Sequence, residues 1–146
     1  MTQQIILNYA YSFLGTPYRW GGDDPLHGID CSGLVLEVLK AAGVYKGAFD
    51  TTAQGLYDDL TKNKFAALTN SPAPMALAFY GKSVTHITHV AICVSPTHIL
   101  EAGGGGSKTV DLQTAAAQNA FVRIRPIDSR VDLVAVLQPI YTWSPK

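Results

Sequence analysis

Apolar side chains in the first sixty residues recur at the three- and four-residue spacing that is typical of helices. In the first such segment, residues 4–14, we expect Ile5, Tyr9 and Phe13 to form the buried stripe, with Gly15 to Pro17 ending the helix. Further helices are predicted over residues 30–42 and about 51–60. Asp30 suits the N-cap of the second helix and Gly43 suits the position after its end.

From residue 75 onward the pattern changes to short runs of branched and alternating residues, which favour strands. A short apolar run covers residues 75–80, and strands are expected over 87–94, 99–102, 121–126 and 133–138. Helices followed by strands predict an α+β domain, with N-terminal helices packed on a small antiparallel sheet. Since no repeat or long linker divides the chain, we expect residues 1–146 to form a single domain.

Charge and composition exclude several classes of function. Eleven basic and eleven acidic residues balance, which gives no electrostatic reason to expect a nucleic acid as partner. No apolar run approaches the ~20 residues that a membrane helix needs. The first residues lack the pattern of a secretory signal, so we expect synthesis in the cytoplasm. The two cysteines are interpreted as thiols, because one pair is no disulfide framework.

Cys31 is the first candidate for chemistry, because it directly follows the N-cap Asp30. Unpaired backbone N–H groups and the positive end of the helix dipole lie at such a position. Both favour a thiolate, the nucleophilic form of cysteine, and the same N–H groups can stabilise an oxyanion. The alternative interpretation is a small buried apolar residue, which is what most free cysteines are.

A nucleophilic cysteine needs a base, and a base is usually oriented by a third group. Among the four histidines, His89 lies inside a predicted strand, which is a rigid place for a base. Glu101 lies on the return strand of the same hairpin and is the candidate for the orienting group. Each also has an ordinary structural interpretation: a half-buried histidine bonded to backbone, and a solvated charge on the hairpin.

The turn of this hairpin decides whether Glu101 can reach His89. A two-residue loop, Pro96-Thr97, would leave Glu101 on the opposite face of the sheet from His89. A loop of three residues, 95–97, places Glu101 opposite Ala91, on the same face as His89 and diagonal to it. A catalytic role for Glu101 therefore requires an odd loop or an equivalent bulge.

Two other patterns resemble ligand sites only superficially. His86 and His89 are spaced H-x-x-H, but residues three apart on a strand point to opposite faces, so no metal site is predicted. No cofactor is implied either. The run Gly103 to Thr109 resembles a phosphate loop but lacks the glycine directly before Lys108. We interpret it as a flexible loop beside the active site.

Three segments, in this order and spacing, resemble the NlpC-type cell-wall cysteine peptidases. They are GTPYRWGG (15–22), GIDCSGLV (28–35) and HVAI (89–92), and the resemblance extends over roughly residues 5–140. These enzymes are compact relatives of papain that cleave the stem peptides of bacterial peptidoglycan. The resemblance implies a papain-like fold, with Cys31 as nucleophile and His89 as base.

The resemblance also implies substrate contacts. Tyr18 matches a tyrosine whose hydroxyl lies near the nucleophile, Asp30 and Ser32 match positions beside the substrate groove, and we assign Trp20 to substrate binding as well. The third catalytic position, usually histidine, falls on Glu101 here. A carboxylate at that position favours the imidazolium form of His89.

The activity that the resemblance implies is an endopeptidase acting on the amide between D-glutamate and diaminopimelate, with peptidoglycan stem peptides as partner. A free carboxylate beside that amide calls for a cation in the groove, and Arg19 and Arg123 are the candidates. The stretch 99–107 is similar to phage-encoded members of the family, which implies access to the wall from a virion or after lysis. The alternatives are an amidase or acyltransferase on the same scaffold, or a non-catalytic wall-binding tail component.

Overall fold

The computed structural model describes residues 2–24 and 26–145, and the fold is α+β, as predicted. Three helices precede most of the sheet: α1 (Gln3–Tyr11), α2 (Cys31–Ala41) and α3 (Ala53–Lys62). A short helix α4 (Leu112–Gln118) and a 3-10 turn (Ile127–Ser129) interrupt the later strands. Within the described residues, no helix combines the length and the apolar character needed to cross a membrane.

In the described part of the chain, six strands form one antiparallel sheet in the order β3-β8-β4-β5-β6-β7. The strands are β3 (Ala66–Leu68), β4 (Leu77–Gly81), β5 (Ile87–Cys93), β6 (His98–Gly103), β7 (Phe121–Pro126) and β8 (Leu133–Pro139). A separate two-stranded ribbon joins β1 (Asp23–Asp24) to β2 (Gly28–Ile29). The four later strands predicted from the sequence are thus present, and the apolar run at 75–80 becomes the central strand β4.

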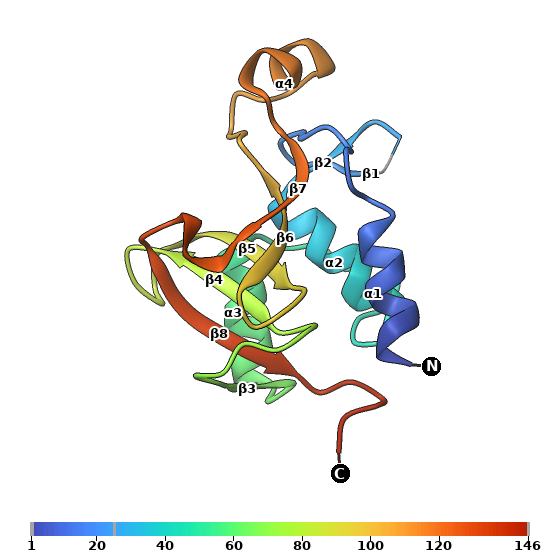
Figure 1. Cartoon of the computed structure of the whole chain (residues 1–146), viewed down its shortest axis with the longest axis vertical. Helices are drawn as coiled ribbons and strands as arrows, with labels where there is room; N and C mark the ends of the chain where they lie inside the picture. Colours follow the sequence, from blue (N-terminus) through green and yellow to red (C-terminus); the bar gives the residue numbers. More distant parts are fainter. Residues whose placement is uncertain (1, 25, 146) are drawn as a thin grey trace.

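Helices α2 and α3 cover one face of the sheet, and α1 packs beside α2 (Figure 1). The main core lies between these layers, where Leu34, Val38, Phe79, Val90 and Ile92 are fully buried. A smaller apolar cluster lies on the other face of the sheet and consists of three alanines with Tyr80, Cys93, Ile99 and Val136. The sheet therefore separates a helical layer on one face from a smaller apolar cluster on the other.

Capping residues explain where α2 and α3 begin. The Asp30 side chain accepts a hydrogen bond from the backbone N–H of Gly33, and the Thr52 side chain accepts one from Gly55. After α2, Gly43 has a φ of 81°, a backbone conformation that glycine adopts without strain. The predicted start and end signals of α2 are therefore confirmed.

The predicted buried stripe of α1 is wrong at two of its three positions. Ile5 and Tyr9 are exposed, and the helix buries Ile6, Leu7 and Ala10 instead, whereas Phe13, just beyond the helix, is buried as predicted. Apolar residues occur on several sides of this helix, so packing against α2 decides which side is covered. The helix also ends at Tyr11, earlier than residue 14, where the Ser12 hydroxyl donates to the backbone carbonyl of Tyr9.

Candidate active site

Asp30 fixes the loop that leads to Cys31 as well as the helix that begins there. One carboxylate oxygen accepts from Gly33 N–H at 2.7 Å and the other from Gly21 N–H at 3.0 Å. Burial raises the pKa of Asp30, although these hydrogen bonds oppose the shift. Cys31 is thereby held at the first turn of α2, partly exposed, where the helix presents its free N–H groups.

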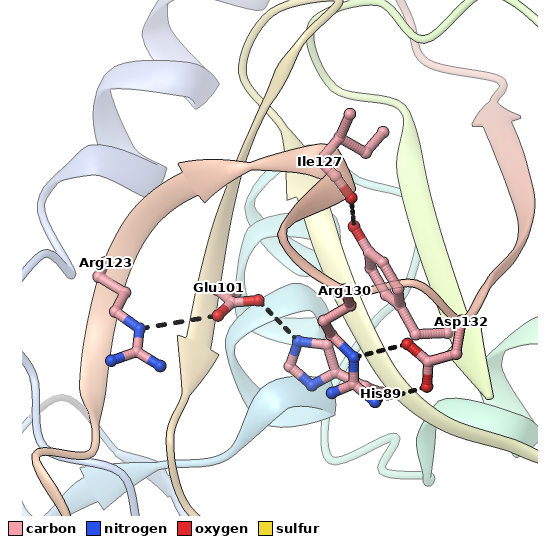
Figure 2. A network of polar contacts seen from close by, with 7 residues as sticks. His89, Glu101, Arg123, Ile127, Arg130 and Asp132 are labelled. Carbon is pink, nitrogen blue, oxygen red and sulfur yellow. Dashed lines mark hydrogen bonds and ion pairs between the residues drawn. The ribbon is translucent and has the colours of Figure 1, made fainter.

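The hairpin between β5 and β6 has the odd loop on which the Glu101 prediction depended. Ile92 pairs with Leu100 and Cys93 with Ile99, and the backbone N–H of Val94 donates to His98. Continuing this register places Glu101 opposite Ala91. His89 Nε2 lies 3.0 Å from Glu101 Oε1, and both residues are buried (Figure 2). The predicted contact between the two side chains is confirmed.

A β-bulge precedes His89 in the sheet. Tyr80 pairs with His89 and Gly81 with Ile87, so Thr88 has no partner on β4. Because of this bulge, Ile87 and Val90 both lie in the core beneath the helices although they are three residues apart. Bulges of this kind change where the neighbouring side chains point. Here Thr88, the residue at the bulge, lines the same hollow as Cys31.

The ionisable groups Cys31 and Glu101 both act on the protonation of His89. Burial alone would lower the pKa of His89, but hydrogen bonds to Cys31 and Glu101, and the charges of both, outweigh burial and raise the pKa to about 9. Burial would raise the pKa of Glu101, but its hydrogen bond to His89 and the nearby charges lower it. With Nε2 bonded to Glu101, the other ring nitrogen, Nδ1, is left for Cys31. The arrangement favours the imidazolium form of His89 beside Cys31.

Further polar groups lie on either side of the His89–Glu101 pair across the sheet (Figure 2). Arg123 Nε lies 3.7 Å from Glu101 Oε2 on the next strand, β7. On the other side, the Tyr80 ring lies 5.6 Å from the His89 ring, and the Tyr80 hydroxyl donates to the carbonyl of Ile127. Arg123 thus holds Glu101 from one side, and Tyr80 packs against His89 from the other.

The residues assigned to substrate binding surround Cys31. A hollow of about 800 Å³ beside Cys31 is lined by all four of them, Tyr18, Trp20, Asp30 and Ser32. Tyr18 is buried, and its pKa is raised first by burial and then by the charges of Cys31 and Asp30. Trp20 is 54% exposed, at the outer rim of the hollow. The structure thus brings the sequence-predicted residues together.

A second hollow, of about 520 Å³, shares Tyr18, Trp20 and Cys31 with the first and is also lined by His89 and Glu101. The glycine-rich segment 103–106 forms one wall, so its predicted position beside the site is confirmed. Gly105 is required there, because a Cβ atom on it would collide with the Tyr18 ring. The loop therefore fixes the tyrosine that lies next to Cys31.

The two arginines proposed as carboxylate clamps lie in different places. Arg123 lines the second hollow, whereas Arg19 is exposed and lines a separate depression with His27. Sequence reasoning missed Arg125 and Arg130, which also line the second hollow. Alternation along 121–126 places residue 125 on the same face as 123 and was the available signal for Arg125. No comparable pattern pointed to Arg130.

The histidines of the H-x-x-H pattern do not share a ligand site. The His86 ring contacts the hydroxyls of Ser83 and Thr85, whereas His89 contacts Glu101. Among residues 2–24 and 26–145, no group of three or more histidine, cysteine, aspartate or glutamate side chains is arranged to hold a metal ion.

The family model for NlpC/P60 proteins matches residues 15–126, from the loop before Cys31 to the end of β7. The chain belongs to the NlpC/P60 family. The resemblance inferred from three sequence segments is confirmed, and the matched range contains Cys31, His89 and Glu101.

Individual relatives agree with this assignment. The NlpC/P60 chain is 30% identical over 113 residues to the bifunctional muramidase/DL-endopeptidase CwlT of Bacillus subtilis, which covers 76% of this chain and 32% of CwlT. It is 46% identical over 37 residues to the murein DD-endopeptidase MepH of Escherichia coli, covering 25% of this chain and 14% of MepH. The chain spans a third or less of the length of these curated relatives.

The fold is also similar to solved structures of the family. The crystal structure of an NlpC/P60 family protein from Bacillus cereus aligns with 97% of this chain and 40% of its own, with a TM-score of 0.70 and 18% identity. The papain-like α+β architecture expected from the sequence is therefore the architecture of the NlpC/P60 fold.

Proposed function

We propose that this NlpC/P60 protein is a cysteine endopeptidase that hydrolyses an amide bond in peptidoglycan stem peptides, using Cys31, His89 and Glu101. The observation that carries the proposal is the buried contact of 3.0 Å between His89 Nε2 and Glu101, with Cys31 at the start of α2 lining the same hollow as both residues. Cys31, His89 and Glu101 can therefore serve as nucleophile, base and orienting group.

The reaction follows from these contacts. The Cys31 thiolate attacks the amide carbonyl, and backbone N–H groups at the first turn of α2 stabilise the oxyanion. The His89 imidazolium gives its proton to the leaving amine, so the C–N bond breaks and a thioester remains. Neutral His89 then takes a proton from water, whose hydroxide attacks the thioester, and the Cys31 thiolate leaves. Glu101 holds the ring orientation through both steps.

The names of the relatives support the substrate class. CwlT is a DL-endopeptidase and MepH a murein DD-endopeptidase, so both act as endopeptidases. For this chain we assign the bond between D-glutamate and diaminopimelate, which is the bond implied by the resemblance in the segments around Cys31 and His89.

Mass spectrometry of muropeptides tests both levels of the proposal. Purified wall that contains diaminopimelate is incubated with the protein and, as a control, with Cys31→Ala. New fragments that begin with diaminopimelate support the assigned bond, and cleavage elsewhere in the stem supports an endopeptidase of different specificity. Release of whole stem peptides from the sugar indicates an amidase instead, and an unchanged wall rejects hydrolysis.

A further inference from the structure

Strand β7 presents two arginines to the hollow beside His89. In the register with β6, Arg123 pairs with Glu101 and Arg125 with Ile99. The two arginines lie two residues apart on one face, about 7 Å along the strand. Arg130, which follows the 3-10 turn, lines the same hollow, and Arg125 lies close enough to Glu101 for its charge to lower the pKa of that carboxyl.

The hydrogen-bond donors of these arginines are not equally occupied. Arg130 donates to both carboxylate oxygens of Asp132, at 2.9 and 2.8 Å. Arg123 donates to the carbonyl of Asn119 at 3.4 Å, while its buried Nε has no hydrogen-bond partner. Within the described residues, the Arg125 side chain makes neither a hydrogen bond nor an ion pair, although it is only partly exposed. The cation without a partner is therefore Arg125.

The balance of charge in this hollow is positive. Among the residues that line it, the carboxylate is Glu101, and it is already bonded to His89. The facing wall, 103–106, consists of glycines and brings no anionic side chain. The larger hollow of about 800 Å³ has the opposite character, because Asp30 and Asp50 line it. An anionic group next to the reacting carbonyl is thus favoured on the β7 side.

We propose that Arg125, assisted by Arg123, forms a subsite that binds a substrate carboxylate adjacent to the scissile amide and so selects stem peptides with a free carboxylate over amidated ones. The guanidinium of Arg125 forms a charge-assisted pair with this carboxylate, and the positive charge of Arg123 in the same hollow adds to the attraction. This subsite rests on the proposed function, because it requires that a stem peptide binds across Cys31.

Binding and cleavage are measured separately with one set of synthetic peptides. The set is L-alanyl-γ-D-glutamyl-diaminopimelate and analogues in which one carboxylate at a time is a carboxamide. Calorimetry uses the inactive Cys31→Ala protein, alone and combined with Arg125→Gln, Arg125→Lys or Arg19→Gln. Arg19 is the matched control, because it is an exposed arginine outside both hollows. Thermal melting checks that each variant is folded.

We expect one carboxamide analogue to bind about tenfold more weakly than the parent peptide, the lower end of what a charge-assisted hydrogen bond contributes. Arg125→Gln should abolish this difference, Arg125→Lys should retain part of it, and Arg19→Gln should retain all of it. The subsite is refuted if no analogue binds more weakly, if no peptide binds, or if the difference survives in Arg125→Gln. Failure of the wild-type protein to cleave the parent peptide refutes the proposed function separately.

Discussion

Replacing Glu101 with glutamine removes the charge beside His89 while keeping the shape of the side chain. The hydrogen bond that is weakened is 3.0 Å long and buried. Since a hydrogen bond to a charged group contributes about 1.5–3 kcal/mol and one pKa unit is about 1.4 kcal/mol, the pKa of His89 should fall by about one to two units. It should move from about 9 to about 7.5.

This shift makes a prediction that depends on pH. If the imidazolium is the active form, the fraction of active enzyme barely changes at pH 6.5. At pH 8.5 it falls by roughly eightfold. The ratio of kcat/KM between wild type and Glu101→Gln should therefore widen by about that factor between the two pH values. If Glu101 only orients the His89 ring, the substitution should lower kcat/KM by the same factor at both pH values.

The assay is kcat/KM on a stem peptide from pH 5 to 10, with Glu37→Gln as the control because Glu37 is the other glutamate of the chain. Stability gives an independent readout. The pKa of His89 is raised on folding, so this contribution is complete below about pH 6.5 and is lost as pH rises through about 9. Glu101→Gln should flatten that decline. Superimposable pH profiles for wild type and Glu101→Gln would refute the assignment of Glu101.

Three further predictions concern the nucleophile and its surroundings. Cys31→Ala should abolish hydrolysis, whereas Cys93→Ala should retain most of it, because Cys93 is buried and burial raises its pKa to about 12; the check is release of peptide fragments by each variant. Activity should survive EDTA and be lost after iodoacetamide, and loss to EDTA with recovery on adding zinc would contradict the cysteine mechanism. Gly105→Ala should lower kcat/KM about tenfold and the melting temperature by only a few degrees, because the added methyl group displaces the buried Tyr18 ring; unchanged kinetics would show that this ring position is not needed.

Local signals in the sequence determined the elements that carry the nucleophile. Asp30 and Gly43 bound α2 through contacts within a few residues, so the position of Cys31 at a helix start follows from the sequence alone. Branched apolar residues and the turn at 95–97, which are also local signals, identified the strands of His89 and Glu101. Some short elements were missed, namely the ribbon of β1 and β2, strand β3, and helix α4, although Asp111 caps the start of α4 and the left-handed Asn119 ends it.

Only the tertiary structure decided how these elements meet. The sequence allowed loops of either parity between β5 and β6, and the observed pairing of Cys93 with Ile99 selected the one that brings Glu101 to His89. The bulge at Thr88 likewise had no local signal. Nor did the sequence indicate that Arg19 lies apart from the second hollow, which Arg125 lines. Capping and alternation act over a few residues, whereas strand register and the convergence of loops depend on residues far apart in the chain.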